Sequence, residues 1–314
     1  MTWLTWRQHR ADAVMLALLI ACLGVGVILL LALYAPRFPG MAEFCTGGPA
    51  ETTSCTSVDP QVNATLWALI DYGGLLLPVL VGTFVGAATV ARELENPTHV
   101  LAWTQGISRR EWFRRRVLLL SLGGVAAAAL CAAAMQGWFA AQRGAGASIW
   151  QGFDIAPPVL VAYTLFALCL GTAAGAALKR TTPAVLLTVV VYIAVRVTIA
   201  LLARPRYLPP VTATFSATHS GAFLAVPTGD WPVGPTVCVD AAGRAVGSFA
   251  GAGFCALPPP AVPVLGGDHY PISAIAQVQP ETRFWLFQGI EAVIFVVLAL
   301  ALLALAHRLV MRVR

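Results

Sequence analysis

Near the end of the chain, residues 284–309 read FWLFQGIEAVIFVVLALALLALAHRL, an apolar run that holds a single carboxylate, Glu291. A helix that crosses a membrane needs about 20 apolar residues, because the hydrocarbon core is roughly 30 Å thick and a helix rises about 1.5 Å per residue. Five earlier stretches meet the same criterion, at residues 13–34, 67–91, 117–139, 159–178 and 184–202. The pattern therefore predicts an all-α polytopic membrane protein with six transmembrane helices, the first of them uncleaved.

The composition of the chain agrees with insertion into a membrane. Hydrophobic residues make up 58% of the 314 residues, charged residues make up 11%, and the mean hydropathy is +0.77. Soluble domains average about 45–50% apolar and about 25% charged residues, so lipid must cover much of this surface. The net charge of +6 does not indicate nucleic-acid binding, because most basic residues stand in short clusters beside the apolar runs.

These basic clusters predict the orientation of the chain. They lie before the first run, between the second and third, between the fourth and fifth, and after the last; their members are Arg7, Arg10, Arg92, Arg109, Arg110, Arg114, Arg115, Arg116, Lys179, Arg180, Arg308, Arg312 and Arg314. Arginine and lysine are enriched in cytoplasmic loops, so we expect a cell-membrane protein with both termini in the cytoplasm. The longest outer segment is then 203–283, which is rich in Pro, Gly and Thr and reads as an irregular or short-stranded cap.

The cysteines divide between loops and apolar runs. Four lie in loops predicted to face outward: Cys45, Cys55, Cys238 and Cys255. Disulfides form in oxidising compartments, so this even set predicts two bridges, one between the first two residues and one between the last two. Sequence does not determine the connectivity; pairing across the loops and four free thiols are the alternatives.

The loop between the second and third runs carries signals for a short helix. Asn96 is a good N-cap, Pro97 suits a first helical position, and Gly106 can close a helix, so residues 97–105 are predicted to be helical. Residues 108–111, Ser-Arg-Arg-Glu, form a capping box that starts the next long helix.

The predicted helix at residues 97–105 has an apolar side formed by Val100, Leu101 and Trp103. A surface helix that exposes such residues is typical of a docking element for another protein. The alternative is an interfacial turn among the lipid headgroups, with Trp103 as an aromatic anchor.

The same region resembles a known family. Residues 91–99 (ARELENPTH) and 101–109 (LAWTQGISR) look like the coupling region of type-2 ABC exporter permeases, and residues 2–10 (TWLTWRQHR) resemble the amphipathic helix at the start of such permeases. The sequence departs from the family at Pro97, where Gly is common, and at Gly106, where Pro is common. The outer segment is also longer than the short loop of simpler members.

The resemblance implies a permease subunit that works as a homodimer or pseudo-dimer, with an interfacial helix at residues 1–12, five spans within 13–202, and the last span with a basic tail at 284–314. It implies that residues 97–105 form a coupling helix that docks a separate ABC ATPase subunit. The residues expected to form or hold the docking surface are Glu93, Glu95, Asn96, His99, Val100, Leu101 and Trp103.

ATP hydrolysis is expected on the partner chain. A Walker A loop needs a lysine followed by Ser or Thr, whereas the one lysine, Lys179, is followed by Arg180. We therefore expect no cofactor on this chain, ATP and Mg on the partner, and no catalytic or metal site, since the five histidines are scattered. A lipophilic substrate such as a drug, peptide antibiotic or lipid is inferred by analogy. The alternatives are a membrane-anchored sensor or a binding or immunity protein; an intramembrane enzyme is disfavoured because no catalytic constellation appears.

Three charged residues lie within or near the ends of the apolar runs, and such residues usually serve function or pair with one another. Asp71, Arg196 and Glu291 are at similar depth in the outer half of the predicted bundle, which favours one ion-pair cluster. For Asp71 alone, the alternative is a side chain that reaches the interface. Close helix approach is predicted at two small-residue pairs, Gly82/Gly86 and Gly171/Gly175, within one protomer or between two.

Overall fold

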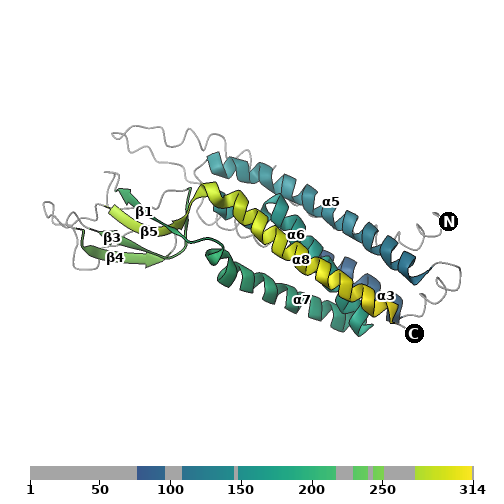
Figure 1. Cartoon of the computed structure of the whole chain (residues 1–314). Coiled ribbons are helices and arrows are strands. Elements are labelled where there is room, and N and C mark those ends of the chain that lie inside the picture. Colours follow the sequence, from purple (N-terminus) through teal and green to yellow (C-terminus); the bar gives the residue numbers. More distant parts are fainter. Residues whose placement is uncertain are drawn as a thin grey trace. The chain divides into compact units, whose positions relative to one another are not determined.

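The computed structural model of the chain describes residues 76–95, 108–144, 148–216, 229–239, 243–250 and 273–312 (Figure 1). They fall into two compact units. The helical unit contains the described parts of Met1–Ala145, together with Asp154–Ile199 and Gln288–Arg314, and the sheet unit contains those of Gly146–Phe153 and Ala200–Phe287. The expected first span, at residues 13–34, lies outside the described residues.

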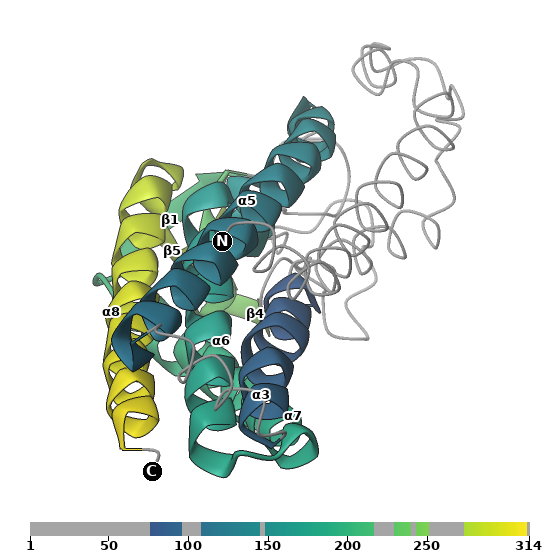
Figure 2. The ribbon, with the colours of Figure 1, turned by 90° about the vertical axis from the view of Figure 1, so that its right-hand side faces the viewer.

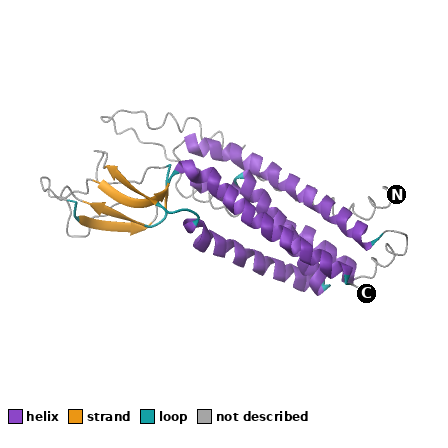
Figure 3. Cartoon of the chain, viewed as in Figure 1, coloured by secondary structure: helices purple, strands orange, loops and turns teal. Residues whose placement is uncertain are grey.

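Five helices in the described part of the chain are long and apolar enough to cross a membrane (Figure 3). They correspond to the second to sixth expected spans. Their main elements are a π-helical segment Val81–Ala87 continued by α3 (Ala88–Glu95), then α5 (Arg109–Gly144), α6 (Pro157–Leu178), α7 (Thr181–Thr198) and α8 (Phe284–Met311). The helix α5 extends beyond the expected 117–139 at both ends, and its start is capped as the sequence predicts, because the Ser108 hydroxyl accepts from the Glu111 amide at 3.2 Å.

The helix α6 is the centre of the helical unit and is buried along most of its length. In the view of Figure 2 it lies between α8 and α3. Its apolar sequence is expected for a helix surrounded by other helices. By contrast α5, α7 and α8 each expose a row of large apolar side chains, among them Leu122, Val190 and Leu300, which fits helices whose outer faces contact lipid.

The glycines bring α6 and the π-helical segment into unusually close contact. A Cβ added at Gly82 would lie 2.6 Å from the Ala167 carbonyl oxygen, and one at Gly175 would lie 2.8 Å from that of Ala87. A Cβ at Gly171 would collide with the Gly82 carbonyl oxygen. The small-residue pairs thus pack against each other within one chain, where backbones can approach because no side chain separates them.

One end of the helical unit carries most of its exposed basic residues and is called the basic end below. There α3 ends, α5 begins, α6 turns into α7, and α8 ends; the exposed basic residues are Arg92, Arg110, Arg114, Arg115, Lys179, Arg180, Arg308 and Arg312. The turn from α6 to α7 is tight because Lys179 adopts a left-handed conformation, with φ of 51°, and its amide donates to the Gly175 carbonyl.

The sheet unit corrects the all-α expectation, so the chain is mostly helical rather than all-helical. The described parts of residues 203–283 contain five short strands: β1 (Val211–Ser216), β2 (Trp231–Pro232), β3 (Pro235–Val239), β4 (Ala245–Ala250) and β5 (Ser273–Gln279). They pair antiparallel in the order β1-β5-β3-β4, and β2 also pairs with β5 (Figure 3). The alternation in β5 buries small residues, Ala274 and Ala276, which is a weak strand signal in a sequence.

An aromatic cluster supports the sheet unit. The Trp150 ring packs against four other aromatic rings at centroid distances of 5.2–6.0 Å, those of Phe153, Trp231, Phe284 and Phe287. Buried rings of this kind contribute area and favourable edge-to-face geometry. Cys238 is buried in β3, whereas Cys45, Cys55 and Cys255 lie outside the described residues, so the two disulfides remain predictions.

Candidate functional site

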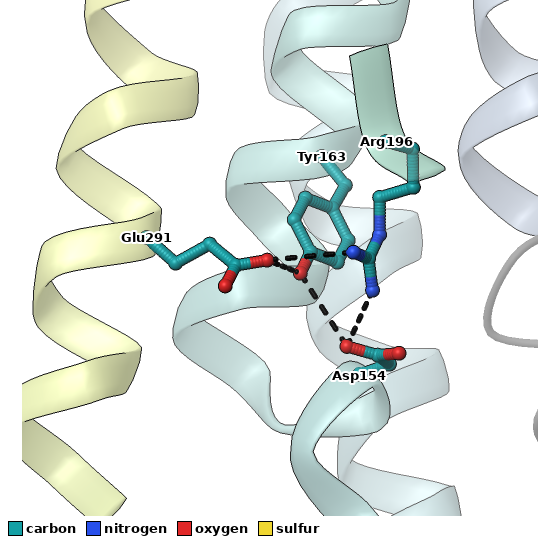
Figure 4. A network of polar contacts seen from close by, with 4 residues as sticks. All are labelled: Asp154, Tyr163, Arg196 and Glu291. Carbon is teal, nitrogen blue, oxygen red and sulfur yellow. Dashed lines mark hydrogen bonds and ion pairs between the residues drawn. The ribbon is translucent and has the colours of Figure 1, made fainter. Parts of the chain in front are cut away.

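Four polar side chains from separate parts of the helical unit meet inside it (Figure 4). Asp154 lies near the end of a 3-10 segment (Ile149–Ile155), Tyr163 belongs to α6, Arg196 to α7, and Glu291 to α8. The Arg196 guanidinium forms an ion pair with Asp154, and its other terminal nitrogen lies 3.5 Å from Glu291 Oε1. We call these four residues the buried network.

Tyr163 connects the two carboxylates of the buried network. Its hydroxyl donates a hydrogen bond to Glu291 and also lies 3.5 Å from Asp154 Oδ1. Its ring lies under the guanidinium, with the Arg196 carbon Cζ 4.3 Å from the ring centroid. A cation over an aromatic face is favourable, more so where water is excluded, so Tyr163 stabilises both the anion of α8 and the cation of α7.

Burial divides the network into a dry side and a wetter side. The Glu291 side chain is 0% exposed and that of Arg196 is 6% exposed, whereas Asp154 is 41% exposed. Removing charges from water is costly unless they are paired and hydrogen-bonded. The Arg196 guanidinium lies between two carboxylates and compensates the negative charge of both. Its contact with Glu291 joins α7 to α8.

The sequence predicts that Arg196 and Glu291 lie in one cluster, and the structure brings these two together. Asp71, the third member expected, lies outside the described residues. Sequence reasoning missed Asp154 and Tyr163, because it read the first as a loop residue and the second as an ordinary span residue. A signal was present, since a buried tyrosine needs a partner for its hydroxyl and an acidic residue stands just before the Pro157 start of α6.

A second set of polar contacts lies at the basic end, beside the predicted docking loop. Glu93, near the end of α3, forms an ion pair with Arg116 of α5, whose side chain is buried. Glu95 accepts two hydrogen bonds from Thr181, one from the amide at 3.1 Å and one from the hydroxyl at 2.8 Å. Glu95 therefore caps the N-terminus of α7, where amide groups lack partners and negative charge is favourable.

The spacing of Glu93 and Glu95 explains why they contact different helices. Residues two apart on an α-helix point roughly 200° away from each other, so one side chain reaches α5 and the other reaches α7. In the structure Arg116 is the partner of Glu93, because it lies nearly two turns into α5 on the face toward α3.

The remaining docking residues predicted from the sequence lie outside the described residues, and so does the whole of the 97–105 helix; they are Asn96, His99, Val100, Leu101 and Trp103. The two flanks of that loop, the end of α3 and the start of α5, are described and are joined by the Glu93–Arg116 pair. Within the described ranges, no group of three or more His, Cys, Asp or Glu residues is placed to hold a metal ion.

Comparison with known protein families gives a match over most of the helical unit. A family model described as "ABC-2 membrane transporter related" matches residues 13–204, which include the docking loop and α3 to α7. No curated protein and no solved structure matches the chain significantly. The family match covers more than half of the chain and agrees with several apolar helices of membrane-spanning length. The chain therefore belongs to the ABC-2 membrane transporter related family, and it is a multi-pass membrane protein and a transport subunit of the ABC permease type rather than an enzyme.

Proposed function

We propose that the chain is the permease subunit of an ATP-driven exporter, and that a separate ATPase subunit docks on residues 97–105. The observation that carries this proposal is the pair of contacts beside the loop, Glu93 with Arg116 and Glu95 with Thr181. A loop that only lies among lipid headgroups would need no such attachment to two neighbouring helices. A loop that transmits force needs both flanks fixed.

The contacts define which helices would move together. A push on the loop acts on α3 and α5 directly, and on α7 through the Glu95 cap at Thr181. The glycine contacts join α3 and its π-helical extension to α6. Along α7, the path from Thr181 to Arg196 is about 22 Å. Closure of the ATPase subunits would therefore move Arg196 relative to Glu291 in the buried network, where α7 contacts α8.

The direction of transport and the substrate class are part of the proposal. The apolar rows exposed on α5, α7 and α8 favour a lipophilic substrate that enters from the bilayer, such as a drug, peptide antibiotic or lipid. We propose that the basic end lies in the cytoplasm together with both termini, because arginine is enriched on the cytoplasmic side of membrane proteins. The permease is proposed to work as a homodimer or pseudo-dimer, with ATP and Mg bound by the partner subunits and with the sheet unit outside.

Glu95→Gln tests the coupling role directly, because it keeps the size of the side chain and weakens its cap on α7. In membranes containing the permease–ATPase complex, we expect the variant to retain the ATPase but to lose most of the substrate-stimulated hydrolysis. Glu111→Gln is the matched control, since that carboxylate lies at the same end and pairs only locally, with exposed Arg115. Equal stimulation in the Glu95 variant and the wild type would remove the main support for coupling.

A further inference from the structure

A groove runs between the first turns of α5 and the last turns of α8 at the basic end of the helical unit, with a cavity volume of about 860 Å³. The two helices contact each other at its floor, where the Phe113 and His307 rings pack edge to face at a centroid distance of 5.6 Å. Phe113 and Val117 are buried there. The groove belongs to neither the buried network nor the contacts of Glu93 and Glu95.

One end of the groove carries positive charge that no described acidic residue pairs with. Arg110 and Arg114 stand one turn apart on α5 and Arg308 faces them from α8, and all three are exposed. None of them forms an ion pair with a residue that the structure describes. Glu111 is the one acidic residue in the lining, and it is paired with Arg115.

The other end of the groove is apolar and faces outward. Leu118 of α5 is 62% exposed and Leu300 of α8 is 60% exposed. The helices are antiparallel, so both walls of the groove change from basic to apolar in the same direction. The wall on α5 runs from Arg110 to Leu118, and the wall on α8 runs from Arg308 to Leu300. The two ends of each wall are eight residues apart in the sequence, a rise of about 12 Å along the helix.

We propose that this groove binds an anionic phospholipid. The phosphate lies among the arginines, whose planar donor groups match phosphate oxygens, and an acyl chain follows the apolar wall into the bilayer. Basic sites between transmembrane helices attract anionic headgroups in this way. A free phosphate would use only the charged end, and a soluble protein partner would not reach Leu118 and Leu300 at membrane depth.

The test is lipid binding to the purified full chain in neutral detergent, measured by native mass spectrometry with phosphatidylglycerol and phosphatidylcholine of identical acyl chains. We expect phosphatidylglycerol to bind at least about tenfold more tightly. Each arginine near an anionic headgroup contributes about a fivefold change in affinity. Arg114→Gln with Arg308→Gln should therefore weaken phosphatidylglycerol binding about 25-fold, whereas Arg92→Gln, an exposed arginine of α3 at the same end but outside the lining, should leave it unchanged.

A second variant tests the apolar part without changing charge. Ala304 lines the groove and is exposed, so Ala304→Trp should fill the groove and reduce phosphatidylglycerol binding while the protein stays folded. Soluble glycerol phosphate should not compete at the same concentration as the lipid. Equal affinity for the two lipids, unchanged binding in the arginine double variant, or full competition by glycerol phosphate would each overturn the proposal. The proposal would also be overturned if the arginine double variant lost co-purification of the ATPase but kept its lipid binding, because the arginines would then bind a protein partner.

Discussion

Replacing Arg196 with alanine would remove the one cation of the buried network and leave Glu291 and Asp154 without it. Breaking a buried ion pair by deleting one partner costs about 3–5 kcal/mol, because an uncompensated charge stays in a dry site. Glu291 is fully buried, so no solvent screens it, and we expect Arg196→Ala to lower the free energy of unfolding by about that amount.

The two carboxylates should differ in their cost because their exposure differs. Glu291→Gln keeps a group that can accept from the Tyr163 hydroxyl, but it loses a charge that lies 3.5 Å from the guanidinium. Hydrogen bonds to charged groups contribute about 1.5–3 kcal/mol. Because the contact of 3.5 Å is long, we expect Glu291→Gln to lower the free energy of unfolding by an amount near the lower limit of this range. Asp154 is 41% exposed, so its ion pair is screened and Asp154→Asn should cost about 0–1 kcal/mol.

The assay is denaturant unfolding of the purified chain in mixed micelles, for the single variants and for a double-mutant cycle of Arg196→Ala and Glu291→Ala. Residues in direct contact show coupling energies of about 0.5–3 kcal/mol, so the double variant should lose less stability than the two single losses added together. Strict additivity, or a larger cost for Asp154→Asn than for Glu291→Gln, would refute the geometry of Figure 4.

Three other predictions concern topology, the disulfide and helix packing. In intact cells lacking the four loop cysteines, a membrane-impermeant thiol reagent should label Ala245→Cys and spare Arg180→Cys, because the basic end is proposed to face the cytoplasm. Non-reducing peptide mapping should show Cys238 linked to Cys255, a bridge that closes a loop of about 17 residues and contributes roughly 3 kcal/mol. Gly171→Val should destabilise the protein by about 1–3 kcal/mol or more, measured by thermal unfolding, because its side chain would meet the backbone of the π-helical segment.

Each of these has a clear contrary outcome. Label at position 180 with protection at 245 would invert the topology. Alkylation of all the loop cysteines without prior reduction would exclude the disulfides. The same valine substitution at Gly137, where an added Cβ meets nothing within 4 Å among the neighbouring atoms, is the packing control, and an equal loss of stability there would mean that close contact is not the cause.

The spans were predictable because their signal is local. An apolar run of about 20 residues has few alternatives to a transmembrane helix, so the helices from α5 to α8 follow from the sequence alone. The pairing of Arg196 with Glu291 also had a usable signal, since charges inside apolar runs stand out. The position of Asp154 just before α6 was a signal for a polar role, but it did not identify Arg196 as the partner, because that pairing depends on how α6 and α7 pack.

The contacts of Glu93 and the sheet unit were harder to predict for a different reason. Glu93 and Arg116 are 23 residues apart, and their pairing depends on how α3 and α5 cross, which no local pattern reports. The strands are short, and the residues they bury are mostly small, Ala274, Ala276 and Cys238 beside Val239 and Val278, whereas Ile275 is exposed. Their alternation is therefore weak beside the Pro- and Gly-rich composition of residues 203–283.

The central claim is that an ATPase subunit docks on residues 97–105, and the most direct measurement is its retention by the purified permease. The chain would be co-expressed with an ABC ATPase subunit, and the ATPase bound to the captured permease would be quantified. We predict near-stoichiometric retention by the wild type and about 30-fold weaker binding by Trp103→Ala, because loss of a buried aromatic anchor costs about 2 kcal/mol or more. Retention by Trp103→Ala equal to that of the wild type, or no retention by either, would contradict the account.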